Sequence, residues 1–184
     1  MEVISMYFGI YDYRTIQSLK PKADNAVLIR ILEPSWEISG CPYVIKNIDD
    51  YNNVLELYFH DITNTQIQLP NTAIGFSKDL AKKLNNFILE NDFDEIAIHC
   101  SAGISRSPAI GLCVSKILQN KEMEDMILSY SHFIPNKQIL EIFNSFNYIT
   151  KPFNGKMIFR NLEFGEFKMP DLKREENGYL ILPF

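Results

Sequence analysis

Apolar residues along this chain fall into two kinds of pattern that alternate with each other. Residues 26–32 form a nearly continuous apolar run, which is typical of a strand buried in a parallel sheet. Residues 54–59 and 95–98 are shorter runs with strand character. Helical spacing of apolar side chains instead recurs in four later segments, at 71–90, about 107–119, about 121–131 and 136–149.

The first twenty residues and the segment at 71–90 give more specific expectations. Residues 1–10 resemble an edge strand or an extended arm, and residues 13–19 predict a short helix with Ile16 and Leu19 turned inward. In the segment at 71–90, one apolar face is expected to contain Ile74, Leu80, Leu84, Phe87 and Ile88.

Strands that alternate with helices predict an α/β fold with a central, mostly parallel sheet flanked by helices. Residues 1–150 are expected to form this single domain. Residues 151–184 are repeatedly interrupted by Pro and Gly and predict a C-terminal extension with a strand-like piece at Met157–Phe159. Its last apolar piece, Tyr179–Leu182, is expected to pack on the core or on a partner.

Composition sets limits on location and partners. A hydrophobic fraction of 46% and a charged fraction of 22% are ordinary for a soluble protein, and a net charge of −5 disfavours an extended nucleic-acid surface. No apolar run approaches the roughly 20 residues that span a bilayer, and the N-terminus lacks a signal-peptide pattern. We therefore expect a cytoplasmic protein without a membrane partner. The three cysteines are odd in number and lack metal-binding spacing, which favours free thiols and no metal.

The candidate chemistry lies in the nonapeptide His99-Cys100-Ser101-Ala102-Gly103-Ile104-Ser105-Arg106-Ser107. It stands between a predicted strand and a predicted helix. Backbone N–H groups at a helix N-terminus bind oxyanions and favour the thiolate form of a cysteine. Arg106 adds a planar set of donors that suits two phosphate oxygens at once. The stretch therefore predicts an anion-binding loop with a nucleophile at its floor.

The pattern Cys100-x5-Arg106-Ser107 resembles the signature of the cysteine-dependent protein tyrosine phosphatase superfamily, and the full wording is closest to its dual-specificity branch. The resemblance extends over about residues 25–145. A strand that ends in Asp, a helix and the strand leading to Cys100 follow the family order. Pro135-Asn136 and Gln138 also recur, and His60-Asp61-Ile62 is similar to a bacterial and phage-type subgroup.

The resemblance implies a role for each residue of the loop. Cys100 is expected to attack phosphorus and form a cysteinyl-phosphate. Arg106 is expected to bind the phosphoryl group together with the backbone N–H groups of the loop. Ser107 is expected to donate to the Cys100 sulfur, and His99 to hold the loop from behind by hydrogen bonds. The phosphate-binding residues expected in this way are Ser101, Ala102, Gly103, Ile104, Ser105 and Arg106. No metal or other cofactor is implied.

Asp61 is the expected general acid. The family places this acid about thirty to forty residues before the cysteine, and Asp61 ends a strong strand 39 residues before Cys100. Asp92 and Asp94 are competitors by spacing, but they precede the strand that leads to Cys100 and should lie at the opposite end of the sheet. Asp79 is expected on the solvent face of a helix.

The implied reaction is hydrolysis of phosphotyrosine, with phosphoserine and phosphothreonine as further substrates, in a phosphorylated protein or peptide. Phosphate or sulfate is the anion expected in the loop. The absence of lysine from the loop disfavours phosphoinositides, and the acidic chain disfavours RNA 5′-triphosphates. The alternatives are a phosphate- or phosphoprotein-binding pseudophosphatase and a phosphatase for a non-protein phosphomonoester. A sulfurtransferase or an arsenate reductase is a third class.

Simpler roles are expected for the remaining polar and thiol side chains. His60 is expected to be structural or solvent-facing, and Cys113 to lie inert in the core. Cys41 is either an isolated thiol or a redox partner of Cys100. Gln138 either orients water or caps a helix, and the Lys78, Lys82 and Lys83 cluster is expected to be a solvated helix face.

Overall fold

The computed structural model describes residues 4–63 and 73–160. Its strands are β1 (Ser5–Tyr11), β2 (Ala26–Leu32), β3 (Asn53–Tyr58), β4 (Glu95–His99) and β5 (Lys156–Phe159). Its α-helices are α1 (Tyr13–Ile16), α2 (Ser35–Ser39), α3 (Lys78–Glu90), α4 (Arg106–Ile117), α5 (Lys121–Ser129) and α6 (Lys137–Asn144), and a 3₁₀ turn spans Ile48–Asp50.

The five strands form one sheet in the order β3-β2-β4-β1-β5, and every neighbouring pair is parallel. This confirms the predicted α/β class. All seven residues of β2 and all five of β4 are buried, as expected for central strands covered on both faces. All strands therefore point their carboxyl ends to one edge, where ligands of such sheets usually bind.

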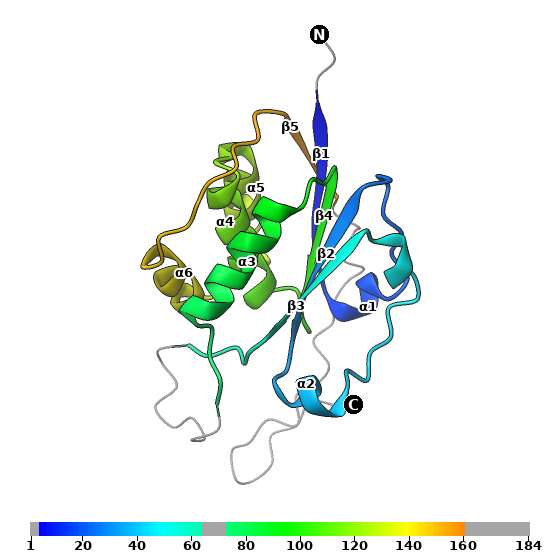
Figure 1. The fold of residues 1–184 in the computed structure, drawn as a ribbon, viewed down its shortest axis with the longest axis vertical. Helices are drawn as coiled ribbons and strands as arrows, with labels where there is room; N and C mark the ends of the chain where they lie inside the picture. The colour runs from blue at the N-terminus through cyan, green and yellow to red at the C-terminus, as the bar shows by residue number, and fades with distance from the viewer. Residues whose placement is uncertain (1–3, 64–72, 161–184) are drawn as a thin grey trace.

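Helices cover the two faces unequally. Helices α3 to α6 lie on one side of the sheet, and α1 lies on the other (Figure 1). The larger core packs beneath α3 to α6 and contains Phe8, Ile29, Ile98 and most buried residues of α4. A smaller core around Tyr11, Leu28 and other residues lies on the opposite face. Helix α4 is thus the central helix, buried along almost its whole length.

The expected edge position of the first strand is wrong. β1 lies inside the sheet, because β4 pairs with one side of it and β5 with the other. The partner that covers its outer side, β5, is only four residues long and comes from the Pro- and Gly-rich end of the chain. The short helix that follows β1 forms as expected, and Ile16 and Leu19 are buried.

The helix expected at 71–90 begins later than its apolar pattern suggested. Ser77 caps it by accepting a hydrogen bond from the N–H of Leu80 at 3.3 Å, so the helix starts at Lys78. Ile74 precedes the helix and is 53% exposed, so its expected place on the buried face is wrong. Residues 71–72, where the expected helix began, lie outside the described residues.

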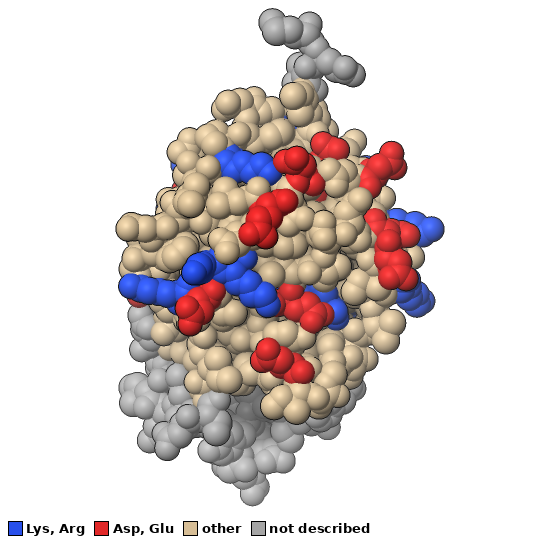
Figure 2. All heavy atoms as spheres, viewed as in Figure 1, with Lys and Arg blue, Asp and Glu red and all other residues tan. Residues whose placement is uncertain are grey.

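The strand predicted at Met157–Phe159 is confirmed as β5, and Met157 is buried against the main core. Residues 161–184, which include the apolar piece at 179–182, lie outside the described residues. Acidic and basic side chains are interspersed over the face shown in Figure 2. Among the described residues, no helix has the length and apolar character needed to cross a membrane.

Candidate active site

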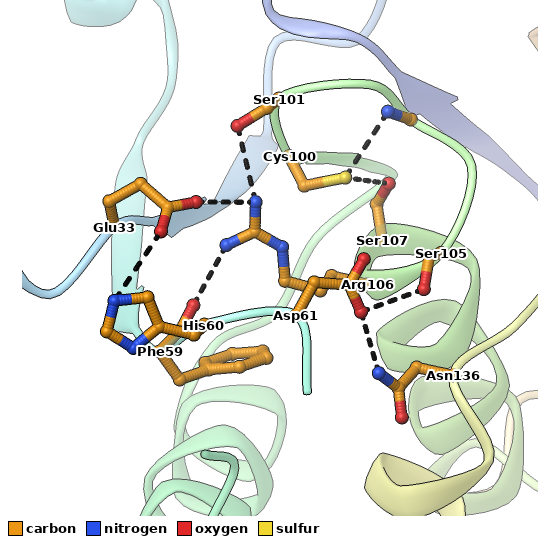
Figure 3. A network of polar contacts seen from close by, with 11 residues as sticks. Glu33, Phe59, His60, Asp61, Cys100, Ser101, Ser105, Arg106, Ser107 and Asn136 are labelled. Carbon is orange, nitrogen blue, oxygen red and sulfur yellow. Dashed lines mark hydrogen bonds and ion pairs between the residues drawn. The ribbon is translucent and has the colours of Figure 1, made fainter. Parts of the chain in front are cut away.

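Cys100 follows the carboxyl end of β4 and is 3% exposed. Two donors surround its sulfur: the backbone N–H of Gly103 lies 3.2 Å from Sγ, and the Ser107 hydroxyl lies 3.1 Å from it (Figure 3). Ser107 sits in the first turn of α4 and is fully buried. The expected placement of a hydroxyl behind the sulfur is therefore present, and both donors can stabilise negative charge on Sγ.

The loop of residues 101–105 turns so tightly that it needs glycine at one position. Gly103 has φ of +70°, and a Cβ at this position would lie 2.8 Å from the backbone N of Asp12. The carbonyl of Ser101 accepts a hydrogen bond from the N–H of Tyr13 at 3.3 Å. The loop is thus held against the junction between β1 and α1.

The other side of the loop leads directly into α4. Ser105 occupies the N-cap position of α4 without a side-chain hydrogen bond to the first turn. The carbonyls of Ile104 and Ser105 accept hydrogen bonds from the N–H groups of Ile134 at 2.8 Å and Asn136 at 3.3 Å. The six residues predicted to bind phosphate therefore lie in one loop and helix start, which is supported on both sides.

The guanidinium of Arg106 is buried beneath the loop and held by neighbouring strand ends. Its Nη1 donates to the carbonyl of Phe59 at 2.8 Å, and its Nη2 pairs with Glu33 at 2.8 Å. Nη2 also lies 3.3 Å from the Ser101 hydroxyl. Nε is buried without a partner among the described residues, and this edge of the guanidinium faces Cys100 (Figure 3). An unpartnered buried donor is costly, and an oxyanion bound in the loop would satisfy it.

Asp61 lies close to this loop, after β3. Its Oδ1 accepts hydrogen bonds from the Ser105 hydroxyl at 2.9 Å and from the side-chain amide of Asn136 at 2.6 Å. The competing Asp92 lies before the amino end of β4 and pairs with Lys151 at 2.8 Å, a hydrogen bond that lowers the pKa of Asp92. Asp94 likewise directly precedes β4. Asp61 is therefore the one of these three carboxylates at the carboxyl edge with Cys100.

His99 is buried behind Cys100, but the hydrogen bonds expected of it are not formed. Neither ring nitrogen has a hydrogen-bond partner of ordinary geometry among the described residues. Burial, followed by the positive charge of Arg30, lowers the pKa of His99 to about 3, against a smaller opposing effect of the Cys100 backbone. His99 is therefore neutral at physiological pH and supports the loop by packing.

Other predicted side chains have structural surroundings. His60 accepts a hydrogen bond at Nδ1 from the N–H of Ile74 at 3.0 Å, in agreement with a structural role. Cys113 is fully buried, and burial raises the pKa of its thiol, which confirms an inert core position. Cys41 is a half-buried free thiol 3.6 Å from a guanidinium nitrogen of Arg30. Gln138 contributes its backbone N–H to the cap of α6.

The sequence did not predict the contacts that Glu33 and Asn136 make in the site. Glu33 follows the carboxyl end of β2 and pairs with Arg106, although only its place after a strand could have indicated this. Asn136 was noted in the Pro135-Asn136 pair, but its contact with Asp61 joins residues 75 positions apart. Lys78, Lys82 and Lys83 are exposed on α3, as predicted.

No family model and no curated protein matches this chain. Four chains of solved structures match it. One of them belongs to a crystal structure described as "Tk-PTP in the active form"; it has 14% identity to this chain and a TM-score of 0.44, and the match covers 78% of this chain and 91% of that one. At this identity and TM-score, the likeness does not identify the family or the reaction of this protein.

Proposed function

We propose that this protein is a metal-independent phosphatase that hydrolyses phosphomonoesters on proteins through a cysteinyl-phosphate intermediate. Phosphotyrosine is the first substrate, and phosphoserine and phosphothreonine are further candidates. The observation that carries this proposal is the unpartnered Nε of Arg106, buried under a loop whose floor is the sulfur of Cys100. A nucleophile and a free cationic donor in one cradle suit a tetrahedral oxyanion.

In the first step, the Cys100 thiolate attacks phosphorus in line with the ester oxygen. The S–P bond forms while the P–O bond to the leaving group breaks. Asp61 gives its proton to the departing oxygen. Arg106 and the backbone N–H groups of the loop balance the negative charge on the three non-bridging oxygens.

In the second step, water attacks the phosphocysteine. The carboxylate of Asp61 takes a proton from this water as its oxygen bonds to phosphorus, and the S–P bond breaks to release inorganic phosphate. The hydroxyl of Ser107, 3.1 Å from Sγ, stabilises the thiolate that leaves. The cycle ends with Cys100 as thiolate and Asp61 protonated, which are their starting states.

Aromatic side chains beside the loop favour an aromatic phosphoester. Tyr13, Trp36 and Tyr43 are partly exposed beside the loop, and together with Cys100 and Ser101 they line a narrow recess of only about 10 Å³. The rings of Tyr13 and Tyr43 lie 4.3 Å apart, and those of Trp36 and Tyr43 lie 5.2 Å apart. Such rings favour contact with a phenyl group. This supports phosphotyrosine over the aliphatic phosphoesters.

The proposal is tested with an aryl phosphate and with a phosphotyrosine peptide at mildly acidic pH in the presence of a chelator. We expect turnover of both by the unaltered protein and by Cys41→Ser, and none by Cys100→Ser. Cys41 is a suitable control because it is a free thiol outside the loop. Tight peptide binding without turnover would contradict the proposal and indicate a pseudophosphatase. Turnover of small phosphomonoesters alone would contradict a protein substrate.

The assignment of the acid has a separate test. Asp61→Asn should slow hydrolysis of a poor leaving group such as phenolate by about 10²–10⁴-fold, the range for loss of a general acid. Asp92→Asn and Asp94→Asn serve as controls, because both aspartates stand before the amino end of β4. If only these controls lose activity, the assignment of Asp61 is wrong.

A further inference from the structure

Asn136 makes every hydrogen bond that a side-chain amide can make. Its Oδ1 accepts from the N–H groups of Gln138 at 2.9 Å and Ile139 at 3.3 Å, which caps α6. Its Nδ2 donates to Asp61 Oδ1 at 2.6 Å and to the carbonyl of Ile62 at 2.8 Å. The residue is 3% exposed. Both N–H groups of Nδ2 and both lone pairs of Oδ1 are thus used in this buried amide.

This pattern fixes which end of the amide faces Asp61. The backbone N–H groups of α6 need an acceptor, so the carbonyl oxygen must lie on that side. The NH₂ group is then necessarily directed at the carboxylate of Asp61 and at the backbone of Ile62. The interaction therefore holds both the side chain and the main chain of the segment that contains Asp61.

The contacts of Asp61 distinguish its two oxygens. Oδ1 accepts from both Asn136 and Ser105. Oδ2 has no partner among the described residues, and Figure 3 shows it directed toward the loop that holds Cys100. A proton carried by Asp61 thus belongs on Oδ2, because Oδ1 is occupied as an acceptor. The two donors leave the proton-bearing oxygen on the side where a leaving group would depart.

The backbone of the same segment is attached to the phosphate-binding loop. The N–H of Ile134 donates to the carbonyl of Ile104 at 2.8 Å, and that of Asn136 to the carbonyl of Ser105 at 3.3 Å. Asn136 therefore joins three parts of the site: the loop through its backbone, α6 through its Oδ1, and the Asp61 segment through its Nδ2.

We propose that Asn136 is a positioning residue that fixes the distance and orientation of Asp61 relative to Cys100, so that Oδ2 delivers the proton to the leaving group. This inference rests on the proposed phosphatase function. It concerns proton transfer by Asp61, and the attack by Cys100 does not depend on it. Loss of Asn136 should therefore affect substrates according to how much their leaving groups need a proton.

The test uses Asn136→Ser and Asn136→Asp, two variants that keep a good N-cap for α6. Serine removes the NH₂ donors, and aspartate replaces them with an oxygen that repels Asp61. The measurement is kcat/KM for phenyl phosphate and for 2,4-dinitrophenyl phosphate, whose leaving group departs without a proton; kcat/KM reports formation of the phosphocysteine and not its later hydrolysis. We expect kcat/KM for phenyl phosphate to fall about 10- to 100-fold, as for a misplaced catalytic group. The value of kcat/KM for the dinitrophenyl ester should stay near the original.

Asn120→Ser is the matched control. Asn120 also caps a helix, accepting from the N–H of Met123 at 2.9 Å, and its Nδ2 also donates to a distant carbonyl, that of Phe153, at 3.0 Å. Its replacement should lower the melting temperature about as much as Asn136→Ser does, without any change in leaving-group dependence.

Two results would overturn the inference. One is unchanged kcat/KM for phenyl phosphate in both Asn136 variants. The other is an equal loss of kcat/KM for both esters, which would indicate a general structural role. Either result leaves the phosphatase function in place, because the unaltered protein still turns over both esters. Failure of the unaltered protein to do so would refute the function itself.

Discussion

The Nε of Arg106 is the individual group that most directly indicates what this site binds. A buried donor without a partner costs about 1–3 kcal/mol of folding free energy, so proteins rarely keep one without use. Here the other two guanidinium nitrogens donate to Phe59, Glu33 and Ser101. These contacts hold the guanidinium in place and leave the Nε–H for a ligand. Under the proposed function, Arg106 is thereby preorganised for the phosphoryl oxyanion before substrate binds.

His99 makes the stability of the protein depend on pH in a specific window. Its pKa in the folded protein is about 3, below the value of 6.5 expected in the unfolded chain. The unfolded chain therefore binds more protons below pH 6.5. The stabilisation is complete above that pH and is lost as the pH falls toward 3. Between pH 7 and pH 5, His99 should reduce the free energy of unfolding by about 2 kcal/mol.

Urea unfolding at several pH values measures this effect. In His99→Gln, the part of the pH dependence between pH 7 and pH 5 that belongs to His99 should disappear. His132→Gln is the control, because His132 is exposed. An unchanged pH dependence in His99→Gln would contradict a neutral, buried imidazole.

Among the individual residues of the site, Cys100, Arg106 and Ser107 could be predicted together because all three belong to one short motif. Asp61 was also predicted, from its place after a strand. The contacts of Glu33 and Asn136 were not predicted, because both depend on which strand ends and loops become neighbours. The hydrogen bonds expected of His99 do not form, because neither buried ring nitrogen meets a partner at hydrogen-bond geometry among the described residues.

The strand ends are the elements that assemble the site. β2, β3 and β4 are neighbours in a parallel sheet, so the residues that follow them meet at one edge. Glu33 comes from the end of β2, and Asp61 from the segment after β3. Cys100 comes directly after β4. The order of the strands thus places Glu33, Asp61 and Cys100 within reach of the start of α4.

Glu33→Gln tests the link between the end of β2 and α4. Loss of this charged hydrogen bond, 2.8 Å long, should leave Arg106 less well oriented and lower kcat/KM for an aryl phosphate about tenfold. Glu37→Gln is the control, since Glu37 is an exposed residue of the neighbouring α2. Equal activity of both variants would show that the ion pair does not position Arg106.

The type of most elements could be predicted from apolar periodicity, whereas some positions and bounds could not. β1 is an interior strand because the short strand β5 pairs with its outer side. This is a long-range contact that no local pattern encodes. The start of α3 depends on the cap at Ser77, which outweighs the apolar spacing that includes Ile74. The cap at Ser77 therefore sets the start of α3, and the pairing with β5 sets the interior position of β1.

On the scale of the whole molecule, β4 connects the candidate active site at its carboxyl end to a buried ion pair at its amino end. β4 leads into Cys100 at its carboxyl end and begins with Glu95, which is 1% exposed, at the other. Glu95 pairs with Arg160 beyond β5 and accepts the N–H groups of Lys22 and Ala23 at 2.5 and 3.0 Å. It thus joins the segment after β5 and the segment before β2 to the base of β4.

Glu95→Gln should destabilise the whole domain and leave its site intact. Removing one partner of a buried ion pair leaves an uncompensated charge and costs about 3–5 kcal/mol. We expect a loss of about 3 kcal/mol in the free energy of unfolding, with kcat for an aryl phosphate little changed below the unfolding transition. Asp94→Asn, an exposed neighbour, is the control. A loss equal to that of the control would contradict the anchoring role.

Capture of the phosphocysteine tests the proposed mechanism most directly. Asp61→Asn is mixed with 2,4-dinitrophenyl phosphate, which phosphorylates the sulfur without needing a proton, while the missing base slows hydrolysis of the intermediate. The mixture is quenched in acid and examined by mass spectrometry of the intact protein and of its peptides. We expect one added phosphoryl group, located on Cys100 and absent in the Asp61→Asn, Cys100→Ser double variant. A phosphoryl group on another residue, or none while dinitrophenolate is released, would contradict the mechanism.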